Sequence, residues 1–242
     1  MARRPVLRAA TLVLIGHLGG LAGLAVPTAS AQVPPDAANV SAYASQRALR
    51  LHDAARRGDL AVLDALLSGP DAATLLKARD DHGRSALHVA AHAGQRGAIE
   101  RLVRAGIAID ALENDRYDAV TIAAVADDEA TLRTLLALGA SARQVTSRYD
   151  GTALIAAAHL GHDGVVRQLI AAGAPLDHVN NLHWTALIEA VVLGDGGARH
   201  QATVRALLDA GARRDLRDRE GRTPLQLARE RGYREIEAML AR

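Results

Sequence analysis

The sequence predicts an all-α repeat solenoid, a stack of paired antiparallel helices in which each pair depends on its neighbours. The prediction starts from residues 81–111 (DHGRSALHVAAHAGQRGAIERLVRAGIAIDA), which form a pattern of two short helices. Ser85 suits a helix N-cap because its hydroxyl accepts from free N–H groups of the first turn. Gly94 and Gly106 suit helix ends because glycine adopts a left-handed backbone without strain. Since isolated helices below roughly 12–15 residues are marginal in water, the unit must stack on copies of itself.

Copies of this unit recur along the chain at a period near 33 residues. An apolar residue of the first helix recurs as Leu51, Leu87, Val120, Leu154, Leu187 and Leu225. An apolar residue of the second helix recurs in step as Leu66, Leu102, Leu135, Leu169, Leu207 and Leu240. Six copies in phase indicate a repeat architecture whose neighbouring units share one continuous core.

Short motifs at the helix starts and ends identify the kind of repeat. They are SALHVAA (85–91), TALIAAA (152–158), GRTPL (221–225) and Gly-Ala pairs at 139–140, 173–174 and 211–212. With these motifs and this period, the chain resembles the ankyrin repeat family over about residues 45–242. The resemblance implies paired antiparallel helices joined by β-hairpin loops, in about six repeats: 45–79, 80–113, 114–147, 148–180, 181–218 and 219–242.

Two of these repeats depart from the common pattern. In repeat three, Asp118 stands where the family usually has Thr and Asp127 where it usually has Gly, so we expect a weaker repeat. Asp127 and Asp128 still suit the N-terminus of the next helix. In repeat five, residues 194–200 (GDGGARH) form an insertion that we expect to lengthen the link between its two helices.

The N-terminus has the pattern of a secretory signal peptide over residues 1–31. Arg3 and Arg4 precede an apolar run at 11–26, and Ala29-Ser30-Ala31 gives a small-x-small cleavage site after Ala31. An uncleaved membrane anchor is the alternative, but the run contains four glycines and is short for a span that needs about 20 apolar residues. We therefore expect an exported protein, periplasmic or secreted, that has no membrane attachment after cleavage.

The sequence also bears on the export route and on the segment that follows the signal peptide. The Arg pair fits both the general and the twin-arginine export route, and the sequence leaves that choice open. Residues 32–44 (QVPPDAANVSAYA) are rich in Pro, Ala and Asn, which predicts a flexible linker before the first repeat.

Charge and cysteine content narrow the function. The chain has 29 Lys and Arg, but residues 32–242 keep 26 of them with all 27 Asp and Glu, a net charge of −1. A near-neutral chain without a basic run does not have the composition of a nucleic-acid-binding protein, so no nucleic-acid partner is expected. The absence of cysteine excludes a disulfide framework and a thiolate metal site.

No pattern of residues indicates catalysis. The sequence has no G-x-S-x-G elbow, H-E-x-x-H pair, phosphate-binding loop or dinucleotide fingerprint, so we expect no enzyme activity, catalytic residue or cofactor. His92 and His159 occupy equivalent positions two repeats apart, roughly 16–20 Å at the usual helix spacing. Zinc ligands lie about 2 Å from the ion, so this pair is not expected to bind a metal.

The family resemblance implies that a protein partner contacts the hairpin tips and the exposed side of the inner helices, which form a concave face. One tip column contains Arg84, Tyr117, Gly151, Trp184 and Arg222. The second contains His82, Asp115, Tyr149, Leu182 and Glu220, and His92, Val125, His159 and Val192 continue the surface along the inner helices. Tyr, Trp and Arg are typical of interface hot spots. The alternative is that these aromatic residues pack only on neighbouring hairpins.

The sequence therefore predicts a monomeric, non-catalytic binding module of the bacterial cell envelope that holds a protein partner of unknown identity. The candidate contact residues are His82, Arg84, His92, Asp115, Tyr117, Tyr149, His159, Leu182, Trp184, Glu220 and Arg222. A second hypothesis is an inhibitor or immunity-type protein that blocks one enzyme or toxin, with the Gly-rich insertion at 194–200 entering the active site of its target.

Overall fold

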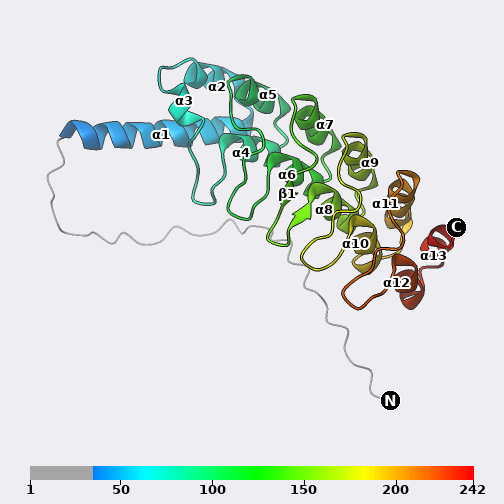
Figure 1. The fold of residues 1–242 in the computed structure, drawn as a ribbon. Coiled ribbons are helices and arrows are strands. Elements are labelled where there is room, and N and C mark those ends of the chain that lie inside the picture. Colours follow the sequence, from blue (N-terminus) through cyan, green and yellow to red (C-terminus); the bar gives the residue numbers. More distant parts are fainter. Residues whose placement is uncertain (1–34) are drawn as a thin grey trace.

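The computed structural model describes residues 35–242 and, from residue 45 onward, their side chains. The helices form two parallel rows that curve together along the stack (Figure 1). The inner row consists of α1 (Pro35–Arg57), α4 (Ala86–His92), α6 (Ala119–Val125), α8 (Ala153–Leu160), α10 (Ala186–Val192) and α12 (Pro224–Arg231). The outer row consists of α2 (Leu60–Leu67), α5 (Arg96–Arg104), α7 (Glu129–Ala137), α9 (Asp163–Ala171), α11 (Ala198–Asp209) and α13 (Arg234–Leu240).

Each helix contacts its partner in the same repeat and the equivalent helices of the adjacent repeats. A short helix, α3 (Ala72–Leu75), lies in the exit loop of repeat one. The loops between repeats project from the inner row on the side away from the outer row (Figure 1). This arrangement confirms the all-α repeat solenoid that the sequence predicted.

The core lies between the two rows of helices. It is built around the two series of recurring apolar residues, the first series on the inner helices (Leu51 to Leu225) and the second series on the outer helices (Leu66 to Leu240). The second series is buried throughout, and so are the first five members of the first series. Leu225, the last member of the first series, is only partly buried, because it lies in the final repeat and no further repeat covers it. The rest of the core is largely alanine, which allows thin helices to pack closely.

Side-chain caps begin the inner helices at the predicted places. Ser85 accepts from the N–H of His88, and the His88 ring accepts in return from the N–H of Ser85, which makes a reciprocal cap. Asp118 caps α6 by accepting from the N–H of Thr121 at 2.7 Å, so it replaces the usual Thr. Asp128 caps α7 in the same way. The lower stability of repeat three stays a prediction.

The β-hairpin loops implied by the family are mostly turns. Within residues 35–242, strand pairing is confined to β1 (Val145–Thr146) and β2 (Gly151–Thr152), which pair antiparallel. In the other loops two backbone bonds close the turn, as from the N–H of Asp80 to the carbonyl of Arg84 at 3.1 Å and from the N–H of Gly83 to the carbonyl of Asp80 at 2.8 Å. The loops therefore keep the hairpin path without a continuous strand.

The prediction of a flexible linker at 32–44 is corrected by the structure, in which α1 already begins at Pro35. A helix of 23 residues continues through this segment, whose Ala residues favour helix once the buried C-terminal half of α1 has formed. Figure 1 shows α1 reaching well beyond the helices it packs against. The signal peptide predicted at 1–31 lies outside the described residues.

The insertion at 194–200 lengthens the link between its two helices, as predicted: the link covers residues 193–197, against 93–95 between α4 and α5 and 126–128 between α6 and α7. α10 ends at Val192 and α11 begins at Ala198, so the last residues of the insertion add a first turn to α11. The remaining loop packs against the last repeat, where the Tyr233 hydroxyl donates to the carbonyl of Gly194 at 2.8 Å. A Cβ at Gly196 would lie 2.5 Å from the Tyr233 ring, so only glycine fits there.

Candidate binding surface

One turn geometry recurs at the tips of all five loops between repeats, which we call tips two to six. They comprise residues 80–84, 113–117, 147–151, 180–184 and 218–222. In tips two to five, the first side chain of the tip accepts from the N–H groups two and four residues later, over 2.9–3.3 Å; these acceptors are Asp80, Glu113, Ser147 and Asn180. Asp218 accepts from the N–H of Arg222 at 2.8 Å. Different side chains thus close the same turn.

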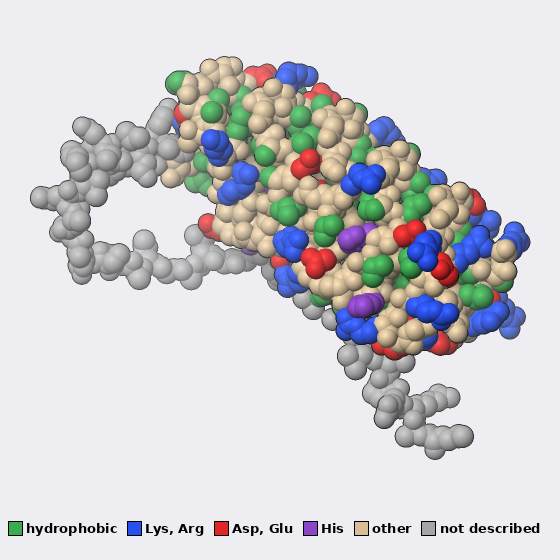
Figure 2. Space-filling model, in the orientation of Figure 1, with side chains coloured by type: hydrophobic (Ala, Val, Ile, Leu, Met, Phe, Trp, Pro, Cys, Tyr) green, Lys and Arg blue, Asp and Glu red, His purple; other side chains and the backbone are tan. Residues whose placement is uncertain are grey.

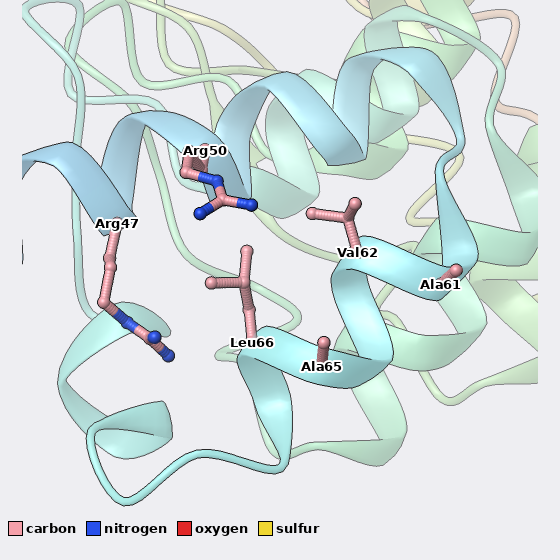
Figure 3. Close-up of a pocket in the computed structure, with 6 residues that line it drawn as sticks. All are labelled: Arg47, Arg50, Ala61, Val62, Ala65 and Leu66. Atoms are coloured by element: carbon pink, nitrogen blue, oxygen red, sulfur yellow. The ribbon is translucent and has the colours of Figure 1, made fainter.

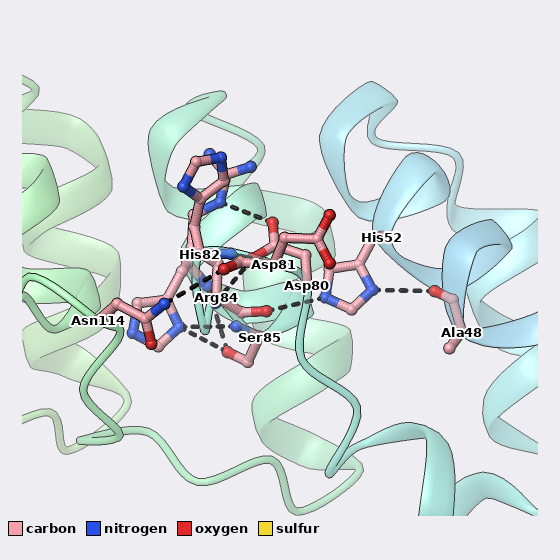
Figure 4. A network of polar contacts seen from close by, with 9 residues as sticks. Ala48, His52, Asp80, Asp81, His82, Arg84, Ser85 and Asn114 are labelled. Atoms are coloured by element: carbon pink, nitrogen blue, oxygen red, sulfur yellow. Dashed lines mark hydrogen bonds and ion pairs between the residues drawn. The ribbon is translucent and has the colours of Figure 1, made fainter. Parts of the chain in front are cut away.

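Tips two and six complete this turn with an arginine of their own. Arg84 Nε donates to Asp80 Oδ2 at 2.7 Å, and Arg222 Nε donates to Asp218 Oδ2 at 2.8 Å (Figure 4 shows tip two). Burial alone would raise the pKa of Asp80, but hydrogen bonds from the main chain and side chain of Arg84 outweigh it, so the pKa lies below its usual value. Arg84 and Arg222, both predicted as contact residues, therefore also maintain the turns.

The His52 ring of α1 joins tip two to repeat one. Its Nδ1 lies 2.9 Å from the carbonyl of Ala48, and its Nε2 lies 3.0 Å from the carbonyl of Arg84 (Figure 4). On the other side of the tip, Asn114 Nδ2 donates to the carbonyl of Asp81 at 3.2 Å. Tip two is thereby held by both of its neighbours.

Tip five has no arginine that could bind the first side chain of the turn, because Trp184 occupies the equivalent position. The free Nδ2 of Asn180 donates instead to Glu189 Oε1 of α10 at 2.8 Å. Burial of the Glu189 side chain, which is 7% exposed, raises the pKa of its carboxyl to about 7. His159 Nδ1 of α8 lies 3.6 Å from Glu189 Oε2, and burial lowers the pKa of His159.

Tips three and four are joined by two crossed ion pairs. Arg116 pairs with Asp150 at 3.1 Å, and Arg148 pairs with Asp115. Backbone bonds also link successive tips, from the N–H of Asn114 to the carbonyl of His82, from Ser147 to Arg116 and from Asn181 to Tyr149, over 2.9–3.2 Å. The tips therefore form one continuous row.

The predicted contact residues lie along this row and on the adjacent inner helices. The exposed ones are His82, His92, Asp115, Tyr149 and Glu220; the partly buried ones are Arg84, Tyr117, His159, Leu182, Trp184 and Arg222. Tyr149 is 52% exposed at the middle of the row, whereas Trp184 packs against the core. Burial, together with the acids Asp115 and Glu113, raises the pKa of Tyr117.

The fourth residue of every tip has a left-handed backbone, and this feature escaped the sequence analysis. The φ angles are +73° at Gly83, +67° at Arg116, +53° at Asp150, +64° at His183 and +77° at Gly221. For a residue with a Cβ, this conformation costs roughly 1–2 kcal/mol. An alignment of the five tips would have revealed the three positions, since glycine stands there only in tips two and six.

The side chains of the three strained residues make no contact that offsets this cost. The carbonyl of Asp150 lies 2.6 Å from His178 Nε2, and the carbonyl of Arg116 accepts from the N–H of Ser147 at 3.2 Å, but glycine would make the same main-chain bonds. The ion pair between Arg116 and Asp150 is about half exposed on both sides, and such pairs contribute about 0–1 kcal/mol. His183 is exposed, and its imidazole makes neither a hydrogen bond nor an ion pair with any of the described residues. Its main-chain N–H closes the turn to the carbonyl of Asn180 at 3.0 Å.

Other features of the surface offer less to a ligand. A shallow pocket of about 300 Å³ lies between α1 and α2, lined by Arg47, Arg50, Ala61, Val62, Ala65 and Leu66, away from the tips (Figure 3). In the part of the chain that the structure describes, no three His, Asp or Glu side chains are grouped as metal ligands. None of the described helices has the length and apolar character of a membrane span.

Basic and acidic side chains alternate over the face shown in Figure 2, without a continuous basic strip. Several of the arginines are directly paired with acids, as Arg167 is with Asp163 and Arg199 with Asp127. A strand of nucleic acid needs an extended row of unpaired cations. This face has no such row.

Comparison with known proteins identifies the family of the fold. The model of the family described as "Ankyrin repeats (3 copies)" matches residues 51–146, 122–213 and 154–242. The chain belongs to the ankyrin repeat family. Ankyrin repeats are protein-interaction modules, generally without enzyme activity. This assignment confirms the resemblance noted in the sequence.

Two ankyrin repeat proteins illustrate the similarity, and a further solved structure shares the fold. The ankyrin repeat protein YahD of Escherichia coli (strain K12) is 36% identical over 189 residues, 77% of this chain and 92% of its own length. An ankyrin repeat domain of Acinetobacter baumannii AYE is 46% identical with a TM-score of 0.73, covering 79% of this chain and 95% of that chain.

The third neighbour is one chain of a complex between the predatory endopeptidase Bd0816 and the immunity protein Bd3460 of Bdellovibrio bacteriovorus. It is 23% identical with a TM-score of 0.66, and the match covers 79% of this chain and 96% of that chain. At this identity the likeness concerns the fold.

Proposed function

We propose that the protein is a non-catalytic binding module of the bacterial cell envelope, which holds a protein partner through tips two to five and the concave face of the inner helices. The observation that carries the proposal is the row of tips with Tyr149 exposed at its centre. Tyr117 and Trp184 flank it one tip away on either side. Large aromatic side chains of this kind dominate the binding energy of protein interfaces.

The construction of the tips supports a rigid contact surface. Backbone bonds link successive tips, and side-chain acceptors fix each turn internally. A rigid surface loses little conformational freedom on association, which favours affinity. The partner is proposed to contact the tips as a protein surface, while the protein itself remains a monomer.

The capture of a partner in cells tests the proposed surface. Tyr149→Ala with Trp184→Ala should reduce crosslinked recovery of the partner at least tenfold, because two anchors are removed. Arg133→Ala, an exposed change on the outer helix α7, serves as the matched control and should leave recovery unchanged. Circular dichroism establishes that the double variant is folded. Full recovery by that folded variant would contradict the proposed surface.

The location in the envelope rests on the leader pattern at residues 1–31. A β-lactamase fused after residue 44 should confer ampicillin resistance, because that enzyme protects the cell only from outside the cytoplasm. The same fusion without residues 1–31 should confer none. Resistance from both fusions, or from neither, would contradict export.

A second candidate is an immunity-type inhibitor of one enzyme. The similarity to a chain of the endopeptidase–immunity protein complex favours it, as a likeness of fold. A projecting plug is less favoured, because the loop at 194–197 packs on Tyr233. Identification of the captured partner by mass spectrometry separates the two candidates: a hydrolase that the purified protein inhibits supports the second.

A further inference from the structure

The left-handed residues of the chain divide the tips into two groups. Five residues other than glycine have a positive φ among the described residues, and four of them lie in tips three to five; they are Arg116, Ser147, Asp150 and His183 in the tips, and Asp127 between α6 and α7. Ser147 has a structural reason, because its Oγ closes tip four. Arg116, Asp150 and His183 need another explanation.

Local packing accounts for the glycine of tip two. A Cβ at Gly83 would lie 2.2 Å from Asn114 Oδ1, so the Asn114 side chain would have to move away from the carbonyl of Asp81 that it binds. At Gly221 no atom lies within 4 Å of such a Cβ, and glycine is kept although a side chain would fit. Glycine is thus the unstrained choice at this turn. The three central tips replace it with an arginine, an aspartate and a histidine.

Strain that local contacts do not offset is typical of residues kept for function. Arg116 and His183 are exposed and Asp150 is partly exposed, all at the same corner of neighbouring tips. Next to them in the chain are Tyr117, Tyr149 and Trp184, the aromatic residues of the proposed surface. Strained positions and aromatic side chains therefore coincide in tips three to five and are both absent from tips two and six.

We infer that Arg116, Asp150 and His183 are specificity-determining contacts with the protein partner, held in a strained backbone so that their side chains point outward from the tips. The inference rests on the proposed function and deepens it. It narrows the contact surface to tips three to five and adds three residues to it.

The chemistry of these tips describes the partner. The two ion pairs between tips three and four balance their charges, so a polyanion gains little from this surface. The aromatic rings accept apolar side chains, and the Arg116–Asp150 pair accepts one acidic and one basic group beside them. A folded protein surface with an apolar centre and groups of both charges at its edge fits this arrangement.

Glycine substitutions separate strain from recognition. The triple variant Arg116→Gly, Asp150→Gly, His183→Gly should raise the melting temperature by about 3–8 °C, because three strained positions are relieved in a domain of this size. The Asp150 share should be the smallest, since aspartate tolerates the left-handed region better than arginine or histidine. The same variant should capture the partner at least tenfold less well than the wild-type protein in the crosslinking experiment above.

Asp127→Gly is the matched control. Asp127 also has a positive φ, of +56°, but it lies at the opposite end of α6 and pairs with Arg199. Relief of strain there should leave capture of the partner unchanged. Loss of capture in this variant would mean that stiffness of the stack, and not the tip side chains, controls binding, and would overturn the inference.

The remaining outcomes are each decisive. A triple variant with an unchanged or lower melting temperature overturns the inference without any partner, because the positions would then carry no strain worth retaining. A more stable variant with unchanged capture overturns it while leaving the proposed function intact. A wild-type protein that captures nothing contradicts the proposed function and this inference together, whatever the melting temperatures show.

Discussion

The tips at the two ends of the stack and those in its middle close the same turn with different side chains. Tips two and six combine an aspartate, a glycine and an arginine within five residues, and the arginine of each tip binds the aspartate of the same tip. Tip five uses Asn180 and relies on Glu189 from a neighbouring helix, and tips three and four share ion pairs. The end tips therefore have an aspartate–arginine pair within the turn, whereas the central tips pair with side chains outside their own turn.

This difference shows that the same turn geometry can be closed by different sets of side chains. Side chains in the central tips are therefore free to vary as long as the turn has its acceptor. The central tips contain the aromatic residues and the strained positions, and their buried Glu189 carries an electrostatic penalty. The protein retains costly residues where we propose that the partner binds.

The largest expected effect concerns the core that both regions share. Leu102→Ala in repeat two and Leu169→Ala in repeat four should each lower the free energy of unfolding by roughly 2–5 kcal/mol, because both leucines are fully buried. Urea unfolding followed by circular dichroism measures both variants. A loss below about 1 kcal/mol in only one of them would show that the difference between end and middle extends into the core.

The next effect is the pH dependence of the free energy of unfolding that Glu189 causes. Among the described residues, only the central region contains a carboxyl beside a tip whose pKa is raised by burial. Because burial raises the pKa of the folded carboxyl from about 4.5 to about 7, the folded state holds a proton that the unfolded state releases. This contribution favours folding below about pH 4.5 and is lost as the pH rises to about 7. Glu189→Gln, which stays neutral and retains an acceptor for Asn180, should therefore be more stable than the wild-type protein at pH 8.

The difference between Glu189→Gln and the wild-type protein should be on the order of 3 kcal/mol at pH 8 and close to zero near pH 4.5. Chemical unfolding at both pH values measures it. Because both proteins contain His159, most of the effect of its titration on stability cancels in the difference between them. An equal stability difference at both pH values would contradict a buried, titrating carboxyl at tip five.

The smallest effects compare the turns themselves. Asn180→Ala should cost about 2 kcal/mol, because the N–H groups of Leu182 and Trp184 lose their acceptor and Glu189 loses its donor. Arg84→Ala should cost less than about 1 kcal/mol, because the arginine side chain is 40% exposed and the Asp80 turn remains closed. Thermal unfolding in parallel gives the ranking, and a larger loss for Arg84→Ala would reverse the comparison.

The period of the leucines, the caps at Ser85 and Asp128 and the row of tips were all predictable from the sequence. Each depends on local spacing: a helix face repeats every three to four residues and a repeat every 33 or so. The left-handed tip positions were also visible in principle, as missing glycines. The linker predicted at 32–44 was wrong from Pro35 onward, because Pro and Asn are typical of loops only where no packed helix continues through them, and α1 does so here.

The sequence by itself determined the solenoid, since an amphipathic pair of short helices repeated in phase has only one way to bury its apolar stripes. Only the tertiary structure decided the partners of single polar groups, such as Glu189 with Asn180 and Tyr233 with Gly194. The first bond joins tip five to the helix that follows it, whereas the second joins residues 39 positions apart, so its geometry depends on how neighbouring repeats stack. The same stacking brings Arg116, Asp150 and His183 into one surface, which no single repeat contains.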